Sequence, residues 1–238
     1  MPSYKRILLK LSGEMFAGDS EFGMDREAMS RIAAEIAQAS SGGARFGIVV
    51  GGGNFFRGIH SADSGLQRVS VDHMGMLGTV INAIALCDLL AARGCDARVM
   101  SAVPMPPIVP GFSRQEALRA LDAGQVVIFA AGTGNPFFST DTAAALRAVE
   151  TGADVLAKAT KVDGVYDKDP VRFPEASRYE RISYAEVLSG ELAVMDAAAV
   201  VLCRDNELPV VVFNLKVAGN IGRLANGEAI GTVIGSSR

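Results

Sequence analysis

Short apolar segments alternate with helix-forming segments along the whole chain, and this alternation restricts the fold more than any other feature. Apolar runs of strand length, rich in β-branched residues, occur at residues 6–11, 46–50, 98–102, 125–131, 154–159, 210–213 and 231–235. Segments with helical periodicity, helix formers or capping residues lie between them, at residues 25–42, 69–93, 113–124, 142–149, 194–207 and 220–225. Buried strands connected by helices form a mostly parallel sheet with helices on both faces. The sequence therefore predicts an α/β fold, a three-layer α/β/α sandwich, with the last strand at an edge.

The length and composition fit one domain with a large core. A chain of 238 residues with 49% hydrophobic and 21% charged residues can form one large α/β domain or two small ones. The sequence has no internal repeat and no linker, and the polar stretch 171–181 is typical of an exposed connection. We therefore expect a single domain, 1–238. The net charge of −3 gives no reason to expect nucleic acid as a partner, because phosphate-binding surfaces need clustered Lys and Arg.

The cysteines and the amino terminus indicate a cytoplasmic protein. Cys87, Cys95 and Cys203 form no CxxC pair, and with only two histidines beside them a zinc site is not expected. The segment MPSYKRILLK has no signal-peptide pattern. No apolar run reaches the roughly 18 residues that a membrane helix requires. We therefore expect reduced thiols and no membrane partner.

The segment Gly132–Asp141, GTGNPFFSTD, lies between a predicted strand and a predicted helix. Its glycines allow the backbone to approach a ligand closely, and Asn135-Pro136 favours a turn. The residues Ser139–Asp141 are typical N-caps, and the free N–H groups at a helix start attract anions. The segment is therefore either an anion-binding loop or an ordinary strand–turn–helix connection with a good cap.

Glycines and basic residues also follow the first two predicted strands. Lys10 precedes Ser12-Gly13, where it is either a snorkelling edge lysine or a ligand-binding lysine at a strand's carboxyl end. The second strand runs into three consecutive glycines, Gly51–Gly53, whose cost in conformational entropy favours a functional role. Arg57 follows, and a guanidinium group suits phosphate with two hydrogen bonds. Neither loop fits the Walker A or the GxGxxG pattern.

The predicted strand 154–159 carries Lys158 and also ends in a charged, glycine-containing segment. Because the carboxyl ends of parallel strands gather along one edge of a sheet, we expect all these loops to meet. Two or three positive side chains and many N–H donors, with Asp141 and Asp169 beside them, suit two phosphate groups and Mg²⁺. The sequence therefore predicts phosphoryl transfer, which depends on positioning and charge neutralisation. Whether Lys158 or Lys161 is the second phosphate-binding lysine stays open.

Several longer motifs carry a resemblance to a known family. They are KLSGE at 10–14, GGGNFFRG at 51–58, VDHMGMLGT at 71–79, AGTGNPFFSTD at 131–141, KATKVDGVYDKDP at 158–170 and MD at 195–196. With these motifs, essentially the whole chain resembles the amino acid kinase family, and within it the bacterial UMP kinases (uridylate kinases). KLSGE and GGGN indicate only the wider family, whereas DHMGM together with GTGNPFFSTD is specific to the UMP kinases.

The resemblance implies reversible transfer of the ATP γ-phosphoryl group to UMP, in pyrimidine nucleotide biosynthesis, by direct in-line transfer with Mg²⁺. The implied catalytic residues are Lys10, Arg57 and Asp141. The implied ATP-binding residues are Lys10, Leu11, Ser12, Gly13, Gly53, Arg57, Lys158, Thr160, Tyr166 and Asp169. The implied UMP-binding residues are Gly52, Asp72, Thr133, Gly134, Asn135, Pro136, Phe137, Phe138, Ser139 and Thr140. No residue is implied as a metal ligand, because Mg²⁺ is expected mainly through the ATP phosphates.

The resemblance also implies a division of the chain and an assembly. Residues of about 154–238 would mainly bind ATP, and the preceding part would mainly bind UMP and form subunit contacts. The family is hexameric, which fits the apolar helix 69–93. Many bacterial members are activated by GTP, and members are inhibited by UTP. Where members with a defined GTP site have basic and aromatic residues, this chain has Cys87, Ala91 and Arg98, of which only Arg98 keeps that character.

Other functions stay open. A related kinase that phosphorylates a carboxylate or carbamate would share KLSGE and the glycine loops, but it needs no ribose acceptor such as Asp72. A non-catalytic nucleotide or amino-acid sensor on the same fold need not retain the whole phosphoryl-transfer set of Lys10, Arg57, Asp141 and Lys158. A redox enzyme with a Rossmann fold would need the missing GxGxxG pattern.

Overall fold

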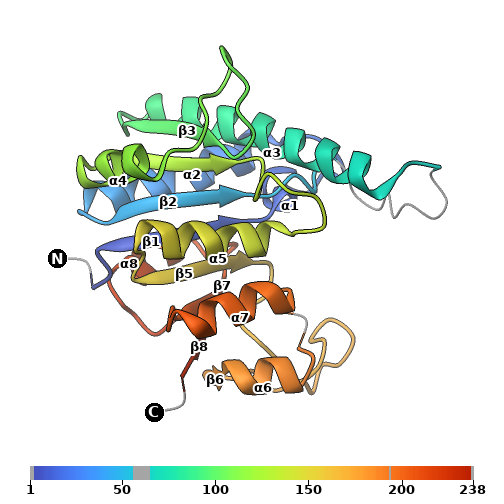
Figure 1. The fold of residues 1–238 in the computed structure, drawn as a ribbon. Helices are drawn as coiled ribbons and strands as arrows, with labels where there is room; N and C mark the ends of the chain where they lie inside the picture. Colours follow the sequence, from blue (N-terminus) through green and yellow to red (C-terminus); the bar gives the residue numbers. More distant parts are fainter. Residues whose placement is uncertain (1–2, 56–64, 193, 237–238) are drawn as a thin grey trace.

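One eight-stranded sheet crosses the molecule in the order β3-β4-β2-β1-β5-β7-β8-β6 (Figure 1). The structure is a computed structural model that describes residues 3–55, 65–192 and 194–236. The strands are β1 (Arg6–Leu11), β2 (Arg45–Val50), β3 (Ala97–Ser101), β4 (Val126–Ala130), β5 (Val155–Thr160), β6 (Arg181–Ser183), β7 (Val210–Asn214) and β8 (Thr232–Gly235). All paired strands are parallel except β7 and β8. The predicted α/β class with a mostly parallel sheet is confirmed.

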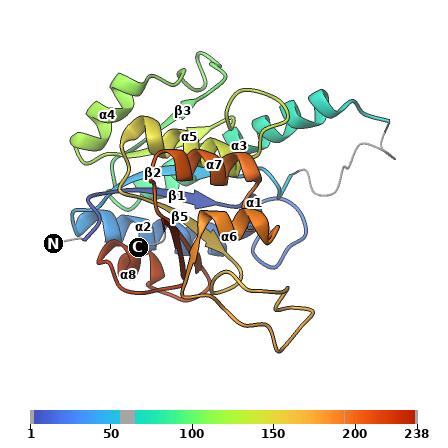
Figure 2. The same ribbon diagram turned by 60° about the horizontal axis from the view of Figure 1, so that its bottom comes forward.

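Helices cover both faces of the sheet. They are α1 (Gly13–Phe16), α2 (Arg26–Ser41), α3 (Arg68–Ala91), α4 (Arg114–Asp122), α5 (Thr140–Thr151), α6 (Tyr184–Ser189), α7 (Ala197–Asp205) and α8 (Asn220–Ala225). In Figure 2, α4, α5 and α7 lie above the sheet and α2 and α8 lie below it. Side chains alternate along β1, so Ile7 and Leu9 pack with α2, α3 and α8, whereas Leu8 packs with α4, α5 and α7. The strands read as continuous apolar runs because both faces are covered.

The longest helix, α3, extends at its amino-terminal end beyond the sheet (Figure 1). Its length and composition alone would allow it to cross a membrane, which the sequence argument did not anticipate. However, 44% of its most apolar window is buried, and the helix packs against α2, β3 and β4. Packing in the core therefore accounts for much of its apolar composition. Val69, Leu77 and Ile81 remain exposed on it.

In the carboxyl-terminal part, one prediction was wrong and two elements were missed. β8 is not an edge strand, because β6 pairs with its outer side. Neither β6 nor α6 was predicted, since a three-residue strand leaves no apolar run to recognise. Two helix starts also differ. The helix expected from Val194 begins after the cap at Asp196, and the helix expected from Thr142 begins after the cap at Ser139.

The amino-terminal cap of α2 gives a test of the fold. Oδ1 of Asp25 accepts a hydrogen bond from the N–H of Ala28 at 2.7 Å. Asp25→Ala leaves this N–H without its partner, so we expect the free energy of unfolding to fall by about 1 kcal/mol. Urea unfolding at one fixed protein concentration measures it. Asp25→Asn should keep nearly full stability because Asn caps as well as Asp, and an equal loss in both variants would contradict the cap as the cause.

Candidate active site

The loops that follow β4, β2, β1 and β5 meet at one edge of the sheet. These four strands are neighbours and parallel, so their carboxyl ends point the same way. Lys10 on β1 and Lys158 on β5 are register partners. The amino-terminal end of α5 lies beside them, since Asp141 in its first turn contacts both lysines. The strand ends therefore bring together the groups that the sequence placed at one edge.

Lys10, Asp141 and Lys158 form a buried charge cluster. Nζ of Lys10 lies 2.8 Å from Oδ1 of Asp141, and Nζ of Lys158 donates a hydrogen bond of 2.6 Å to Oδ2. The three side chains are 9%, 13% and 13% exposed, respectively. Lys158 also donates to the carbonyl oxygen of Val194. One carboxylate thus holds two ammonium groups, and the charge cluster has one positive charge in excess when both lysines are protonated.

The charge cluster shifts the pKa values of its members. Burial would raise the pKa of Asp141, but the ammonium groups of Lys10 and Lys158 outweigh burial and hold that pKa below its ordinary value. Burial lowers the pKa of Lys158, and the nearby Lys10 lowers it further. Asp141 and then Asp196 oppose this decrease without cancelling it. Asp141 is therefore ionised at neutral pH, and its charge favours the protonated form of Lys158.

The glycines at the ends of β1 and β2 are required by close packing. A Cβ atom on Gly13 would lie 2.5 Å from the backbone nitrogen of Gly53, and one on Gly52 would lie 2.5 Å from the carbonyl oxygen of Gly75. Backbone atoms cannot move aside as a flexible side chain can, so larger residues are excluded at both positions. The N–H of Gly51 also donates to the carbonyl of Leu11 at 2.8 Å. These contacts hold β1, β2 and α3 together at the site.

Two polar residues of α3, Thr79 and Asn82, hold site loops and were not identified from the sequence. Asn82 is fully buried, exchanges two hydrogen bonds with the side chain of Asn54, and donates to the carbonyl of Gly51 at 2.7 Å. The hydroxyl of Thr79 accepts the N–H of Ala131 at 2.7 Å. Their spacing of three residues on an apolar helix was the available signal, since such residues share one face.

Asp72 positions the loop between β4 and α5. Its Oδ2 accepts the N–H of Phe137 at 2.8 Å, and its carboxylate pairs with Arg68 at 2.9 Å. Phe137 has a φ of 70° and its side chain is 67% exposed. The hydroxyl of Ser139 then caps α5 by accepting the N–H groups of Asp141 and Thr142. These hydrogen bonds thus hold the loop at Phe137 and again at Ser139, where α5 begins.

A cavity of about 210 Å³ lies between α3 and this loop, and we call it the acceptor-side cavity. Its lining is Gly52, Gly53, Val71, Asp72, Gly75, Met76, Thr79, Gly132, Thr133, Phe138 and Thr140. Five of the residues expected to bind UMP are in this lining: Gly52, Asp72, Thr133, Phe138 and Thr140. The remaining expected residues, Gly134, Asn135, Pro136, Phe137 and Ser139, belong to the loop itself. Among them, the N–H of Asn135 donates to the hydroxyl of Thr133 at 3.1 Å.

A second cavity, of about 620 Å³, is lined by Lys158 of the charge cluster and by residues of β5 and β7 and the loops near them, and we call it the donor-side cavity. Of the expected ATP-binding residues, Lys158, Thr160, Tyr166 and Asp169 line it. Its apolar lining was not predicted and comes from Val162, Val165, Leu192, Val194 and Val212, with Pro170 at the loop. The hydroxyl of Tyr166 donates to Asp163, which raises the pKa of Tyr166, and Asp169 accepts the N–H of Val171.

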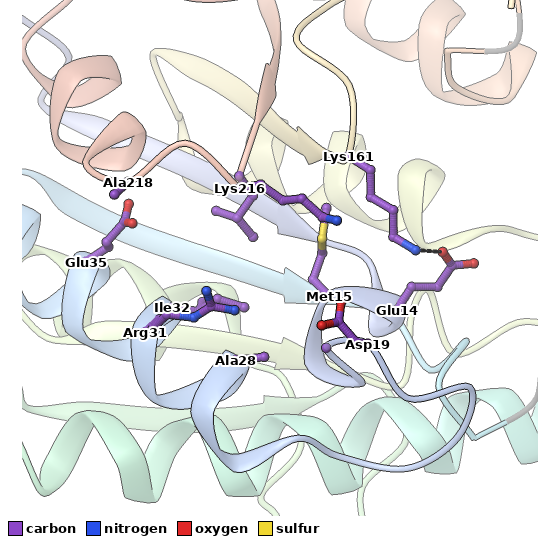
Figure 3. A pocket seen from close by; sticks show the side chains of 12 residues that line it. Glu14, Met15, Asp19, Ala28, Arg31, Ile32, Glu35, Lys161, Lys216 and Ala218 are labelled. Carbon is purple, nitrogen blue, oxygen red and sulfur yellow. Dashed lines mark ion pairs between the residues drawn. The ribbon is translucent and has the colours of Figure 1, made fainter. Parts of the chain in front are cut away.

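The remaining predicted residues occupy different positions. Ser12 lies at the junction between β1 and α1. Lys161 pairs with Glu14 at 2.9 Å at one side of a third cavity, of about 360 Å³, formed by α1, α2 and the loop after β7 (Figure 3). Lys158, and not Lys161, is therefore the second lysine of the charge cluster, beside Lys10. Arg57 lies outside the described residues.

The described part of the site offers few side chains that could bind a metal ion directly. The described residues contain no group of three or more His, Cys, Asp or Glu side chains placed to hold a metal ion. The buried Oδ1 of Asp141 accepts no aligned hydrogen bond within the described part, although Nζ of Lys10 is 2.8 Å away. We regard this contact as an ion pair that leaves a lone pair of Oδ1 unused. That lone pair fits a water molecule bound to a divalent ion whose other ligands come from a substrate.

The charge cluster predicts a defined pH dependence of stability. Asp141→Asn leaves two buried ammonium groups without a counter-charge, so we expect the free energy of unfolding at neutral pH to fall by about 3 kcal/mol. Because the pKa of Asp141 is held below its ordinary 3.8, the native carboxylate stays charged down to that pH. The difference between the two proteins should thus stay constant from about pH 7 to about pH 4 and shrink only at lower pH.

Urea unfolding at several pH values measures this difference. Asp122→Asn is the matched control. Asp122 lies on α4, away from the charge cluster, is 57% exposed, and pairs with Arg6 and Arg45 at the starts of β1 and β2. This substitution should cost far less stability. A difference for Asp141→Asn that already shrinks between about pH 6 and about pH 5 would mean that the pKa is raised, contrary to our assignment.

Comparisons with known proteins agree with this geometry. The family model described as "Amino acid kinase family" matches residues 5–214. The uridylate kinase of Xanthomonas oryzae pv. oryzae is 52% identical over 98% of this chain and 97% of that protein. The solved UMP kinase structure from Bacillus anthracis has a TM-score of 0.96 and 37% identity, covering 100% of this chain and 98% of that one. That from Ureaplasma parvum has a TM-score of 0.91 and 34% identity, with 98% and 99% covered. This chain belongs to the amino acid kinase family.

Proposed function

We propose that this chain is a UMP kinase, which transfers the γ-phosphoryl group of ATP to UMP and forms UDP and ADP. The observation that carries the proposal is a pair of buried ammonium groups on the neighbouring strands β1 and β5. One cavity is lined by residues after β2 and β4, and the other by Lys158 and residues of β5 and β7. Phosphoryl transfer needs its two substrates positioned and their charge neutralised more than it needs covalent help from the protein. The relatives named as uridylate and UMP kinases support UMP as the acceptor.

We assign UMP to the acceptor-side cavity. Its phosphate would lie against backbone N–H groups of Gly52 and Gly53 and of the start of α5, where the helix dipole favours an anion. The carboxylate of Asp72 lines the cavity and is an acceptor for ribose hydroxyls. The aromatic ring of Phe138 provides an apolar surface for the base. The loop 133–140 would thus surround UMP.

We assign ATP to the donor-side cavity and the adjoining strand ends. Thr160, Tyr166 and Asp169 would contact the nucleoside, with the Tyr166 ring against the base. The phosphates would extend toward the charge cluster, along the backbone of 10–13 and Gly53, with Arg57 as an additional cation. Mg²⁺ would be held mainly by these phosphates and would neutralise part of their charge when bound. The unused lone pair of Asp141 suits a water ligand of that ion.

The reaction needs no strong general base. A nucleoside monophosphate has a second pKa of about 6, so its phosphate is mostly dianionic at neutral pH and already nucleophilic. A phosphate oxygen of UMP forms the new bond to the γ-phosphorus while the bond to the β–γ bridging oxygen breaks, and the electron pair leaves with ADP. Repulsion between the two phosphates is the main obstacle. Lys10 and Lys158 reduce it, and Asp141 holds them in place.

We further propose how the chain is organised and regulated. It would form one domain, 1–238, with UMP and subunit contacts mainly in the amino-terminal part and ATP mainly at about 154–238. The exposed apolar residues Val69, Leu77 and Ile81 of α3 would lie at subunit contacts of a homohexamer. UTP would inhibit the enzyme. Activation by GTP stays open, because only Arg98 among Cys87, Ala91 and Arg98 keeps the character of the family's defined GTP site. The protein would act in the cytoplasm in pyrimidine nucleotide biosynthesis.

An acceptor panel tests the proposed function. ATP-dependent ADP release is measured with UMP, CMP, dUMP, glutamate and aspartate, with and without Mg²⁺. We expect strong turnover with UMP that needs Mg²⁺, and none with the amino acids. Turnover with an amino acid would instead identify a carboxylate kinase and refute the roles given to Asp72 and the loop 133–140. Nucleotide binding without any turnover would indicate a sensor.

Lys10 is tested by Lys10→Ala. Because its ammonium stabilises charge that redistributes in the transition state, we expect kcat to fall by about 100-fold or more. Lys5→Ala is the control, since Lys5 is an exposed lysine just before the opposite end of β1 and should leave kcat unchanged. Steady-state kinetics with UMP and ATP measures both variants. An unchanged kcat for Lys10→Ala would remove Lys10 from the chemistry.

A further inference from the structure

Asp196 joins α5 and α7 beside the charge cluster. Its Oδ1 caps α7 by accepting the N–H of Ala199 at 3.0 Å. The same oxygen accepts the hydroxyl of Thr142 at 2.8 Å, and Oδ2 accepts the hydroxyl of Ser139. A helix cap needs only the first of these bonds. The two additional bonds come from another helix, and they connect Asp196 to the first turn of α5.

These bonds belong to a closed series of hydrogen bonds that passes through the charge cluster and returns to Asp196 along the backbone, and we call this series the circuit. The hydroxyl of Ser139 holds the backbone N–H of Asp141 at 3.0 Å. The carboxylate of Asp141 in turn holds Lys158. Lys158 completes the circuit by donating to the carbonyl of Val194, two residues before Asp196. Strand β5 and the starts of α5 and α7 are therefore fixed relative to one another by side-chain hydrogen bonds.

We propose that Asp196 is a positioning residue for phosphoryl transfer: it fixes the start of α5, and thereby the Asp141 carboxylate that holds Lys10 and Lys158. The circuit also borders both cavities, because Thr140 lines the acceptor-side cavity and Val194 lines the donor-side cavity. Asp196 thus keeps the two substrate sites in a fixed relation to the charge cluster. The inference rests on the proposed function.

Because Asp196 is charged, its role can be tested by the pH dependence of kcat, which a purely structural helix cap would not change. In the described part of the chain, Lys158 faces Asp141 from α5, Lys10 from β1 and Asp196 at the start of α7. The thiol of Cys203 on α7 is also near Asp141 and Asp196, but burial raises its pKa to about 12 and keeps it neutral. Removing the negative charge of Asp196 therefore lowers the pKa of Lys158. Because the reaction uses the protonated form of Lys158, the decrease of kcat on the alkaline side of the pH profile then occurs at a lower pH.

The test compares Asp196→Asn with Asp25→Asn in full-length protein. Both aspartates cap a helix by accepting an N–H three residues later, but Asp25 caps α2 on the opposite face of the sheet. For Asp196→Asn we expect kcat with UMP and ATP to fall by about tenfold or more, because small displacements at a reacting centre are costly. KM values should change less than kcat, and the alkaline limb of kcat should move to lower pH. Asp25→Asn should leave both unchanged.

Two outcomes would overturn the proposal. The first is an Asp196→Asn protein with native kcat and an unmoved alkaline limb. The second comes from Thr142→Val, which replaces Asp196→Asn as the test variant if Asp196→Asn does not fold. It removes one bond to Asp196 and no charge, so kcat should fall several-fold while the alkaline limb stays in place, and a native kcat in this variant would refute the positioning role. Wild-type protein that does not phosphorylate UMP would instead refute the proposed function, whatever the variants do.

Discussion

The carboxylate of Asp141 between the ammonium groups of Lys10 and Lys158 is the interaction on which the rest of the site depends. Buried ions are tolerated only when they are paired, and each of these charges has a partner. The pairing requires β1, β5 and the start of α5 to come together at one place. The excess positive charge then favours an anion beside the charge cluster, so the contacts that join β1, β5 and α5 also determine the charge of the site.

Much of this arrangement could be predicted from the sequence, because it follows from strand geometry. Parallel strands place their carboxyl ends together, and Lys10, Lys158 and the glycine loops each follow or end an apolar run. The roles of Thr79 and Asn82 could not be predicted in this way. Their spacing of three residues places both on one face of α3 but does not show which segments they contact, and the partners of Asn82 lie 28 and 31 residues away. Only the folded structure shows which loops these residues hold.

The carboxyl-terminal part was less predictable for a different reason. β6 has three residues and gains its place by pairing with β8, so its stability comes from the sheet and not from local preference. The apolar lining of the donor-side cavity combines residues of the 158–170 motif with Val212 of β7 and with residues just before α7. No spacing along the chain connects these segments. The sequence motifs therefore contained the polar lining of this cavity but not the apolar side chains that come from β7 and from Leu192 and Val194.

The helix α3 connects two distant kinds of surface. On one side its Thr79 and Asn82 are bonded to the loops after β4 and β2, and on the other Leu77 and Ile81 are exposed. Moving α3 away from either loop would break one of these buried hydrogen bonds. One helix of 24 residues therefore connects an exposed apolar surface of the molecule to both loops that line the acceptor-side cavity.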